Sequence, residues 1–242
     1  MIDCLTNSDR MARSQDILEM HRLRCRVFKG RLDWDVEVRD GLECDRFDCL
    51  DPIYLLAFDD SERLVGTWRM LPTTGPYMLR DIFPQLLGGM PAPCDARTWE
   101  GSRFAIDAAA AGRALRDRDG LSAVSRVTSE IFCAVVELCL AFGVEEVVTV
   151  YDARIARLLP RIGCAPRWRS EAHRIGKTIT MAGRFEISDR VLARIRERGG
   201  IEGSVLRHAP MVARRADILT LPMRHHVAAR PIPSADPNRQ AA

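Results

Sequence analysis

The spacing of apolar residues predicts a helix near the start of the chain and a long loop after it. Residues 14–28 place their apolar side chains on one helical stripe, formed by Ile17, Met20, Val27 and Phe28. Ser14 is of a residue type that favours the N-cap position, so it is the expected start. Residues 30–51 mix charges with isolated large apolar residues, which indicates a long and functional loop.

The middle of the chain predicts a hairpin and a third strand. Residues 53–58 and 64–71 are strand-like and are separated by four polar residues, which is a hairpin signal. Residues 72–97 are rich in proline and glycine, so we expect an irregular segment with a short helical piece near 79–87. Residues 98–106 form the expected third strand.

The second half alternates helices with strands. Residues 122–142 keep a 3.6-residue apolar period and stop at Gly143. Residues 144–151 have a continuous apolar core, which is typical of a strand buried on both faces. The remaining predicted elements are a helix from Asp152 to Gly163, a strand at 177–187 and a short helix capped by Ser188. This order predicts an α/β layer structure with a mixed sheet.

Composition narrows the class of protein. The chain has 242 residues, which suits one domain at 1–200 and an extended, partly disordered tail at 201–242. A net charge of +3, from 36 basic and 33 acidic residues, is too small to indicate a nucleic-acid partner. No apolar stretch reaches the length of a membrane span, so no membrane is expected either.

The cysteines argue against a metal site. Eight are present, none in a C-x-x-C pair, so zinc is not expected. Cys133 and Cys139 lie in apolar runs, as small buried hydrophobes do. Free thiols without an export signal point to the cytoplasm.

Several charges fall at positions where a buried side chain is expected. Arg24 lies on the apolar stripe of the first helix, where it needs a carboxylate partner; the alternative is that it reaches out to water. In the loop that follows, Asp45 and Asp48 are candidates to neutralise arginines if they face inward. Otherwise both are solvated, and Trp34 in the same loop is a lid on the core.

The second and third strands add further inward charges. Arg69 is in mid-strand, and Glu100 and Arg103 are three residues apart, which places them on opposite faces of a regular strand. A bulge near Gly101 would bring both to one face and free backbone N–H groups for an oxyanion. The alternative is an ordinary edge strand. The resulting set of arginines and carboxylates suits either a structural cluster or a site for a zwitterion.

At these positions the chain resembles the acyl-homoserine-lactone (autoinducer) synthase family of LuxI type. The resemblance covers about residues 1–187, includes the stretches 66–79, 81–84 and 99–104, and rests on a characteristic set of eight residues: Arg24, Phe28, Trp34, Asp45, Asp48, Arg69, Glu100 and Arg103. It implies an acetyltransferase-like (GNAT-type) three-layer α/β sandwich around a twisted mixed sheet with a bulged, splayed centre. It also implies that S-adenosylmethionine is a substrate, that no cofactor is needed, and that the acyl donor is acyl carrier protein or acyl-coenzyme A.

The resemblance assigns roles to these residues. Glu100 is the candidate base for the substrate amine, with a backbone carbonyl as the alternative. Ser102 and Arg103 join it as catalytic candidates, since N–H groups at 101–103 suit an oxyanion. S-adenosylmethionine is expected to contact two aromatic side chains, two aspartates and the arginines, which would grip its carboxylate. The members of this substrate set are Arg24, Phe28, Trp34, Asp45, Asp48 and Arg69.

The acyl group is expected in the second half of the chain. Thr149 lies where the family often carries a hydroxyl residue that affects preference for 3-oxo chains, or it is a plain strand threonine. The most basic stretch includes Arg154, Arg157 and Arg161, and it is the expected docking face for an acidic carrier protein. The alternative is a solvated helix surface.

Two other functions share some of these features. An acetyl-coenzyme A dependent N-acetyltransferase would share the fold, but its phosphate-binding loop is replaced here by Asp117-Arg118-Asp119-Gly120-Leu121-Ser122. A non-catalytic module that binds S-adenosylmethionine or the lactone would keep the arginines without needing Glu100.

Overall fold

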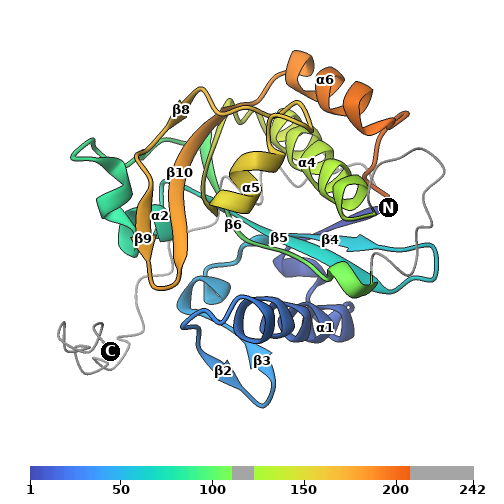
Figure 1. Ribbon diagram of the computed structural model, residues 1–242. Coiled ribbons are helices and arrows are strands. Elements are labelled where there is room, and N and C mark those ends of the chain that lie inside the picture. The colour runs from blue at the N-terminus through green and yellow to red at the C-terminus, as the bar shows by residue number, and fades with distance from the viewer. Residues whose placement is uncertain (111–122, 208–242) are drawn as a thin grey trace. The chain divides into compact units, whose positions relative to one another are not determined.

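A computed structural model describes residues 1–110 and 123–207, which belong to a compact unit of Met1–Ala209 (Figure 1). This unit extends past the domain end expected at residue 200. Val205 and Leu206 are buried, and Leu206 forms a parallel bridge with Ile2. Most of the expected tail, and the 117–122 stretch weighed against acetyltransferases, lie outside the described residues.

The core of the unit is one mixed sheet of eight strands. The strand order is β1-β4-β5-β6-β7-β10-β8, and β9 pairs with β10. All pairs are antiparallel except β6 with β7, which is parallel. The strands are β1 (Ile2–Leu5), β4 (Ile53–Phe58), β5 (Leu64–Pro72), β6 (Thr98–Ile106), β7 (Glu146–Asp152), β8 (Trp168–Arg169), β9 (His173–Ile175) and β10 (Thr178–Glu186). A separate small sheet pairs β2 (Val38–Arg39) with β3 (Leu42–Glu43).

Helices cover both faces of the large sheet and make three layers (Figure 1). On one side lies α1 (Ser14–Arg24), which continues as the π-helix η2 (Cys25–Arg31). On the other side lies α4 (Ala123–Phe142), against which α6 (Asp189–Gly199) packs. Shorter helices are η1 (Asn7–Asp9), η3 (Arg46–Cys49), α2 (Met78–Asp81), η4 (Pro84–Leu87) and α5 (Ala153–Leu158). The layered α/β sandwich around a mixed sheet confirms the expected fold class.

The start of the first helix differs from the prediction. Ser14 is the first helical residue, and Arg13 occupies the cap position without a side-chain cap bond. The chain is already turning there, because the N–H of Arg13 donates to Asp9 and the N–H of Ile17 donates to Arg13. The regular helix also ends at Arg24, since the following turns widen to a π-helix, a feature often found at functional sites.

Three short strands were not predicted from the sequence. β1 has four residues, β8 two and β9 three, too few to show an alternating pattern. The predicted 30–51 loop contains the small hairpin and η3. By contrast, β6 occupies the predicted 98–106 range, and Asp152 and Ser188 cap their helices as expected.

The sheet opens at its centre. β6 pairs with β7 only from Thr98↔Glu146 to Gly101↔Thr149. Beyond that point β6 stays with β5 while β7 stays with β10, so the two parallel strands part. The expected bulge exists, but it lies at Arg103, not at Gly101, which remains paired with both neighbouring strands.

The bulge has a clear geometry. Thr67 of β5 faces Ala105, yet Arg69 faces Ser102, so two β6 residues stand opposite the single residue Trp68. Arg103 takes up the extra length with a left-handed backbone, at φ 56°. This conformation is uncommon for an arginine, so other contacts must hold it in place.

Candidate active site

The α1 face of the sheet carries a buried ion-pair network. Arg24 is fully buried. Its Nη1 and Nη2 donate to the two oxygens of Asp48 at 2.8 and 2.9 Å, and its Nε donates to Glu43. Arg24 therefore does not reach solvent, and the prediction that it needs a carboxylate is confirmed.

The other two arginines extend the network. Arg69 donates to both oxygens of Asp45, at 2.6 and 3.0 Å, and to Asp48 at 2.9 Å. Arg103 pairs with Glu43 and Asp45, each at 2.9 Å. Three guanidinium groups and three carboxylates thus alternate, so their formal charges cancel.

Glu43 was missed by sequence reasoning. It is fully buried at the end of β3 and bridges Arg24 and Arg103. Its sequence neighbourhood gives no signal, because the two arginines that it joins lie 19 and 60 residues away. The third carboxylate expected in the cluster was Glu100, which the structure places beside the network instead.

Electrostatics keep the network ionised. Burial alone would raise the pKa of Asp48, but hydrogen bonds and charge from Arg24, and then charge from Arg69, lower it well below its ordinary value. The pKa of Asp45 is lowered in the same way by Arg69 and Arg103. Tyr54 adds a hydrogen bond from its hydroxyl to Asp48 at 2.7 Å.

Glu100 is held differently. It is fully buried, and its carboxylate accepts the N–H groups of Met78 and Leu79 at 2.9 and 2.6 Å. Burial raises the pKa of Glu100 to about 7, although those N–H groups and the charge of Arg69 oppose the rise. A carboxyl with such a pKa exchanges a proton near neutral pH, as a general base must.

The bulge brings the catalytic candidates to one face, as predicted. Arg103 Nη1 lies 3.3 Å from the sulfur of Met78, the residue whose N–H binds Glu100. Ser102 accepts a hydrogen bond from Nε of Arg69 at 3.1 Å and also contacts Glu100. The ion pairs of Arg103 hold its left-handed backbone.

The two aromatic candidates stack on each other. The ring centroids of Phe28 and Trp34 are 5.2 Å apart with an interplanar angle of 8°. Phe28 is buried beneath the Arg103 guanidinium, whose carbon lies 5.6 Å from the ring centre. Trp34 is half-buried, and its Nε1 donates to Thr178 of β10. Only Trp34 therefore offers a surface to a ligand.

The network encloses Arg24, one of the residues expected to bind S-adenosylmethionine. All three of its guanidinium nitrogens are engaged by carboxylates, and its side chain is 1% exposed. The guanidinium is enclosed by these carboxylates, so a substrate carboxylate does not reach Arg24 directly while the network is intact. Arg103 and Asp45, with side chains 11% and 15% exposed, are the parts of the network that a ligand reaches first.

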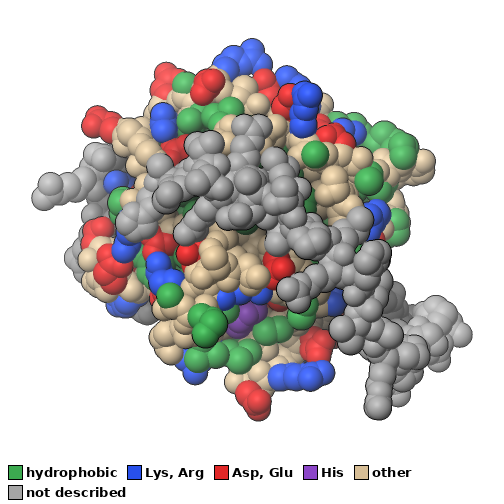
Figure 2. Space-filling model, turned by 180° about the vertical axis from the view of Figure 1, so that it is seen from behind, with side chains coloured by type: hydrophobic (Ala, Val, Ile, Leu, Met, Phe, Trp, Pro, Cys, Tyr) green, Lys and Arg blue, Asp and Glu red, His purple; other side chains and the backbone are tan. Residues whose placement is uncertain are grey.

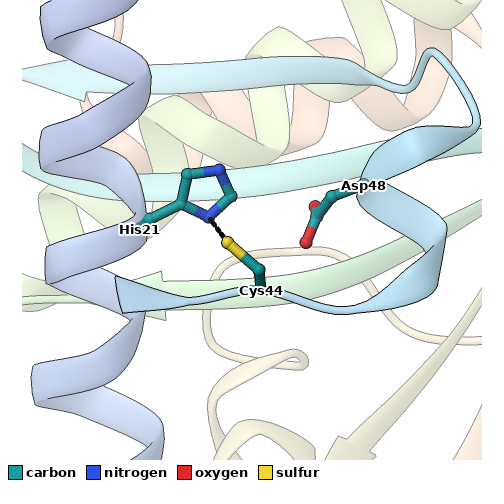
Figure 3. A group of neighbouring side chains, drawn as sticks. All are labelled: His21, Cys44 and Asp48. Atoms are coloured by element: carbon teal, nitrogen blue, oxygen red, sulfur yellow. Dashed lines mark hydrogen bonds between the residues drawn. The ribbon is translucent and has the colours of Figure 1, made fainter. Parts of the chain in front are cut away.

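A group of potential metal ligands, made of His21, Cys44 and Asp48, is in contact with this network. Figure 3 shows His21 and Cys44 pointing toward each other beside Asp48, and their ligand atoms lie within 4.8 Å of one another. However, both oxygens of Asp48 already bind Arg24, and Nδ1 of His21 lies 2.8 Å from the backbone oxygen of Glu43. Burial also raises the pKa of the Cys44 thiol to about 11. The group therefore braces the loop and is a poor cation site.

The opposite face of the splayed sheet is apolar. Thr149 is buried there and lines a narrow cavity of about 20 Å³ together with Trp68 and Phe132. Thr149 therefore faces the space between β7 and α4, where an acyl-chain pocket was expected.

A larger, basic cavity of about 290 Å³ lies at the end of β7. Its cationic lining comes from Arg31, Arg154, Arg157 and Lys177. Arg161 is exposed but does not line this cavity. Elsewhere, on the face seen in Figure 2, the described basic and acidic side chains are interspersed. No helix in the described ranges is long and apolar enough to cross a membrane.

Together, a sheet parted at its centre, a charged site on one face and an apolar cavity on the other define an acetyltransferase-like α/β protein. The chain belongs to the autoinducer synthase family, whose model matches residues 8–195. It is an acyl-homoserine-lactone synthase, and therefore an acyltransferase.

Relatives and solved structures agree with this assignment. An acyl-homoserine-lactone synthase of Agrobacterium fabrum is 41% identical over 167 residues, covering 69% of this chain and 77% of the relative. One from Pseudomonas aeruginosa is 40% identical over 147 residues, covering 60% and 69%. The crystal structure of the AHL synthase LasI aligns with a TM-score of 0.68 and 32% identity, over 84% of this chain and 97% of that one. The coenzyme A-dependent synthase BjaI, solved with SAM and isopentyl-CoA, aligns at 0.72 and 28%, over 89% and 98%.

Proposed function

We propose that the chain transfers an acyl group from a phosphopantetheine thioester to the amine of S-adenosylmethionine, closes the lactone and releases 5′-methylthioadenosine. The observation that carries this proposal is the neutral ion-pair network beside Glu100, a carboxyl whose pKa is raised to about 7. S-adenosylmethionine is consumed as a substrate, and the reaction needs no prosthetic group. None of the eight cysteines forms a disulfide in the described part of the chain, which suits a reducing cytoplasm.

The network suits a zwitterionic substrate. The amino-acid end of S-adenosylmethionine carries both a carboxylate and an ammonium group, and a site of balanced charge can offer a partner to each. Arg103 is placed to meet the carboxylate, and Asp45 the cationic groups, because these side chains reach the surface of the network. Trp34 is the surface for the adenosine or the sulfonium, with Phe28 supporting it from beneath.

Acyl transfer requires a neutral amine. Glu100 takes the proton of the substrate ammonium, directly or through one water molecule, since its pKa lies near the working pH. The amine nitrogen then attacks the thioester carbon, the thioester C–S bond breaks to leave the amide, and the departing phosphopantetheine sulfur takes up a proton and leaves as the thiol. Beyond the Gly101↔Thr149 pair the edge of β6 no longer bonds to β7, so its N–H groups at 102–103 are the candidate oxyanion donors.

Ring closure mainly requires orientation. The substrate carboxylate attacks the γ-carbon of the same molecule, and the C–S bond breaks to give the neutral thioether. Because nucleophile and electrophile are already joined, holding the carboxylate at Arg103 is the main help the protein gives.

The basic cavity suits the donor. Acyl carrier protein and coenzyme A both present the thiol through a phosphopantetheine arm, so both bring a phosphate. Arg154 and Arg157 line the cavity with Arg31 and Lys177, close to the open end of the splay. Arg161 adds charge to the same exposed surface, where an acidic carrier protein would dock.

Release of methylthioadenosine from S-adenosylmethionine tests the function. The full chain is incubated with acyl-coenzyme A in one series and acyl carrier protein in another, and both products are followed by mass spectrometry. Release that depends on an acyl donor supports the proposal, and the faster series identifies the donor. Binding of S-adenosylmethionine without release in either series would overturn it.

A charge variant tests the donor cavity. Arg157→Gln should raise the KM for the acyl donor several-fold, since it removes one of four cations around the phosphate. Arg190→Gln is the matched control, because Arg190 is an exposed arginine on α6 away from the cavity. Equal KM values for the acyl donor in the two variants would show that the cavity does not bind the donor.

A further inference from the structure

Thr149 lies between two glycines on the apolar face of the sheet. It is in register with Gly101 of β6 on one side and with Gly183 of β10 on the other. Residues in register share a face, so the three side-chain positions form a row across the splay. Gly101↔Thr149 is also the last pair before β6 and β7 separate.

An aromatic ring covers each glycine. A Cβ on Gly101 would lie 2.8–2.9 Å from the indole of Trp68, and a Cβ on Gly183 would lie 2.8–2.9 Å from the hydroxyl end of Tyr151. No real side chain tolerates such distances, so the two glycines are what allow these rings to flank Thr149.

Both rings end in a buried polar group with no partner among the described residues. These groups are Nε1–H of Trp68 and the hydroxyl of Tyr151, on side chains only 3% and 6% exposed. Within residues 1–110 and 123–207, the Thr149 hydroxyl makes one long contact, at 3.5 Å from the backbone oxygen of Val150. Buried polar groups in folded proteins are nearly always paired, and leaving one unpaired is costly.

The row borders the apolar cavity. Trp68 and Thr149 line it directly, and Phe185, whose ring centre is 5.9 Å from that of Tyr151, lines it as well. At about 20 Å³ the cavity holds little more than a water molecule, so an acyl chain must move some apolar side chains to enter. By contrast, the polar groups of Trp68, Thr149 and Tyr151 are already in place beside the cavity.

We propose that Trp68 and Tyr151, flanking Thr149, select acyl chains that carry an oxygen near the thioester over unsubstituted chains. This inference rests on the proposed function, and it adds two residues to the threonine that the family resemblance indicated. An indole N–H only donates, so Trp68 requires an acceptor atom on the chain. Tyr151 also donates, since burial raises its pKa to about 12 and keeps its hydroxyl protonated. A carbonyl or hydroxyl oxygen on the chain can accept a hydrogen bond from Trp68 or from Tyr151, whereas a plain chain excludes water and leaves both groups unpaired.

The test compares acyl donors that differ only in this oxygen. The full chain is assayed with unsubstituted, 3-hydroxy and 3-oxo acyl thioesters of equal chain length, at several lengths, on both coenzyme A and acyl carrier protein. We expect kcat/KM to favour one oxygenated donor over the unsubstituted one by roughly 5- to 150-fold, the range for one to two buried hydrogen bonds.

Variants assign the preference to the rings. Tyr151→Phe removes one oxygen atom and Trp68→Phe removes the indole N–H, and each should reduce the ratio of kcat/KM between oxygenated and unsubstituted donors toward unity. Trp99→Phe is the matched control. Trp99 is a buried tryptophan that lies on the same face of β6 as Gly101, but it does not line the cavity. It should keep the wild-type preference.

The outcomes separate this inference from the function on which it rests. Absence of methylthioadenosine release with every donor contradicts the proposed function. Release with equal or better use of unsubstituted donors contradicts the inference alone. If a folded Tyr151→Phe variant keeps the wild-type preference, Tyr151 does not select the acyl chain. The same result in a folded Trp68→Phe variant excludes Trp68 from this role.

Discussion

At the scale of single residues, Glu100 combines two roles. Its carboxylate closes the amino end of α2 by accepting the N–H groups of Met78 and Leu79, which is a structural function. Burial also places its pKa at about 7, which suits a base. Activity at different pH values distinguishes the two roles, because only a base must be ionised.

The Glu100→Gln variant should lose about 10²- to 10⁴-fold in kcat, the usual contribution of a general base. In the wild type, kcat should rise as pH increases through about 7, because the base acts when deprotonated. The variant should lack that rise, which a pH series of methylthioadenosine release measures.

Glu146→Gln is the control for this prediction. Glu146 is a partly buried strand carboxylate whose partner is Arg184, away from the network. It should keep the wild-type pH profile. A Glu100→Gln variant that is as active as wild type, with the same pH profile, would leave Glu100 with its structural role only.

At the scale of elements, the centre of the sheet depends on close packing between β5 and β6. Trp68 of β5 lies over Gly101 of β6, and its ring also contacts Phe104 and Phe132 at centroid distances of 5.2 and 4.7 Å. The bulge at Arg103 occurs opposite this tryptophan. The same few residues therefore set both the bulge and the apolar cavity.

Gly101→Ala should lower the free energy of unfolding by about 1–3 kcal/mol, since its methyl group would force the Trp68 ring to move in a packed core. The backbone conformation of Gly101 is not left-handed, so the cost is purely steric. Chemical denaturation measures it.

Gly75→Ala is the matched control, because a Cβ there meets nothing within 4 Å. It should leave stability unchanged within a few tenths of a kcal/mol. Equal stability of the two variants would show that the Trp68 ring has room to yield.

At the scale of the whole molecule, the ion-pair network joins α1, β3, η3, β5 and β6 into one unit. Two of its carboxylates, those of Asp45 and Asp48, have a lower pKa in the folded chain than in the unfolded chain. Their contribution is therefore complete above the unfolded pKa of about 4 and is lost as pH falls below it. Glu100 acts in the opposite sense, since its raised pKa contributes stability that is lost as pH rises from about 4.5 to 7.

The melting temperature should therefore fall steeply as pH drops below about 4. At neutral pH it should change little on adding salt, because buried charges are poorly screened. Thermal unfolding followed by circular dichroism, over a pH series and a salt series, measures both. A melting temperature that stays constant down to pH 2, or that collapses in salt at neutral pH, would contradict a buried network.

The sequence by itself determined the local elements and the need for charge compensation. The 98–106 strand and the caps at Asp152 and Ser188 were predictable, because periodicity and capping act over a few neighbouring residues. The position of Arg24 on an apolar stripe likewise indicated that it needs a carboxylate partner if it is buried, and the structure shows that it is buried. The family resemblance supplied the activity.

Only the tertiary structure decided which groups meet. Glu43 became the third carboxylate, the bulge fell at Arg103, and unpaired polar groups of Trp68 and Tyr151 came to flank Thr149. These features depend on strand register and on contacts between residues tens of positions apart. A hydrogen bond is directional and short, so a shift of one residue in register would break it, and no local pattern in the chain encodes that register.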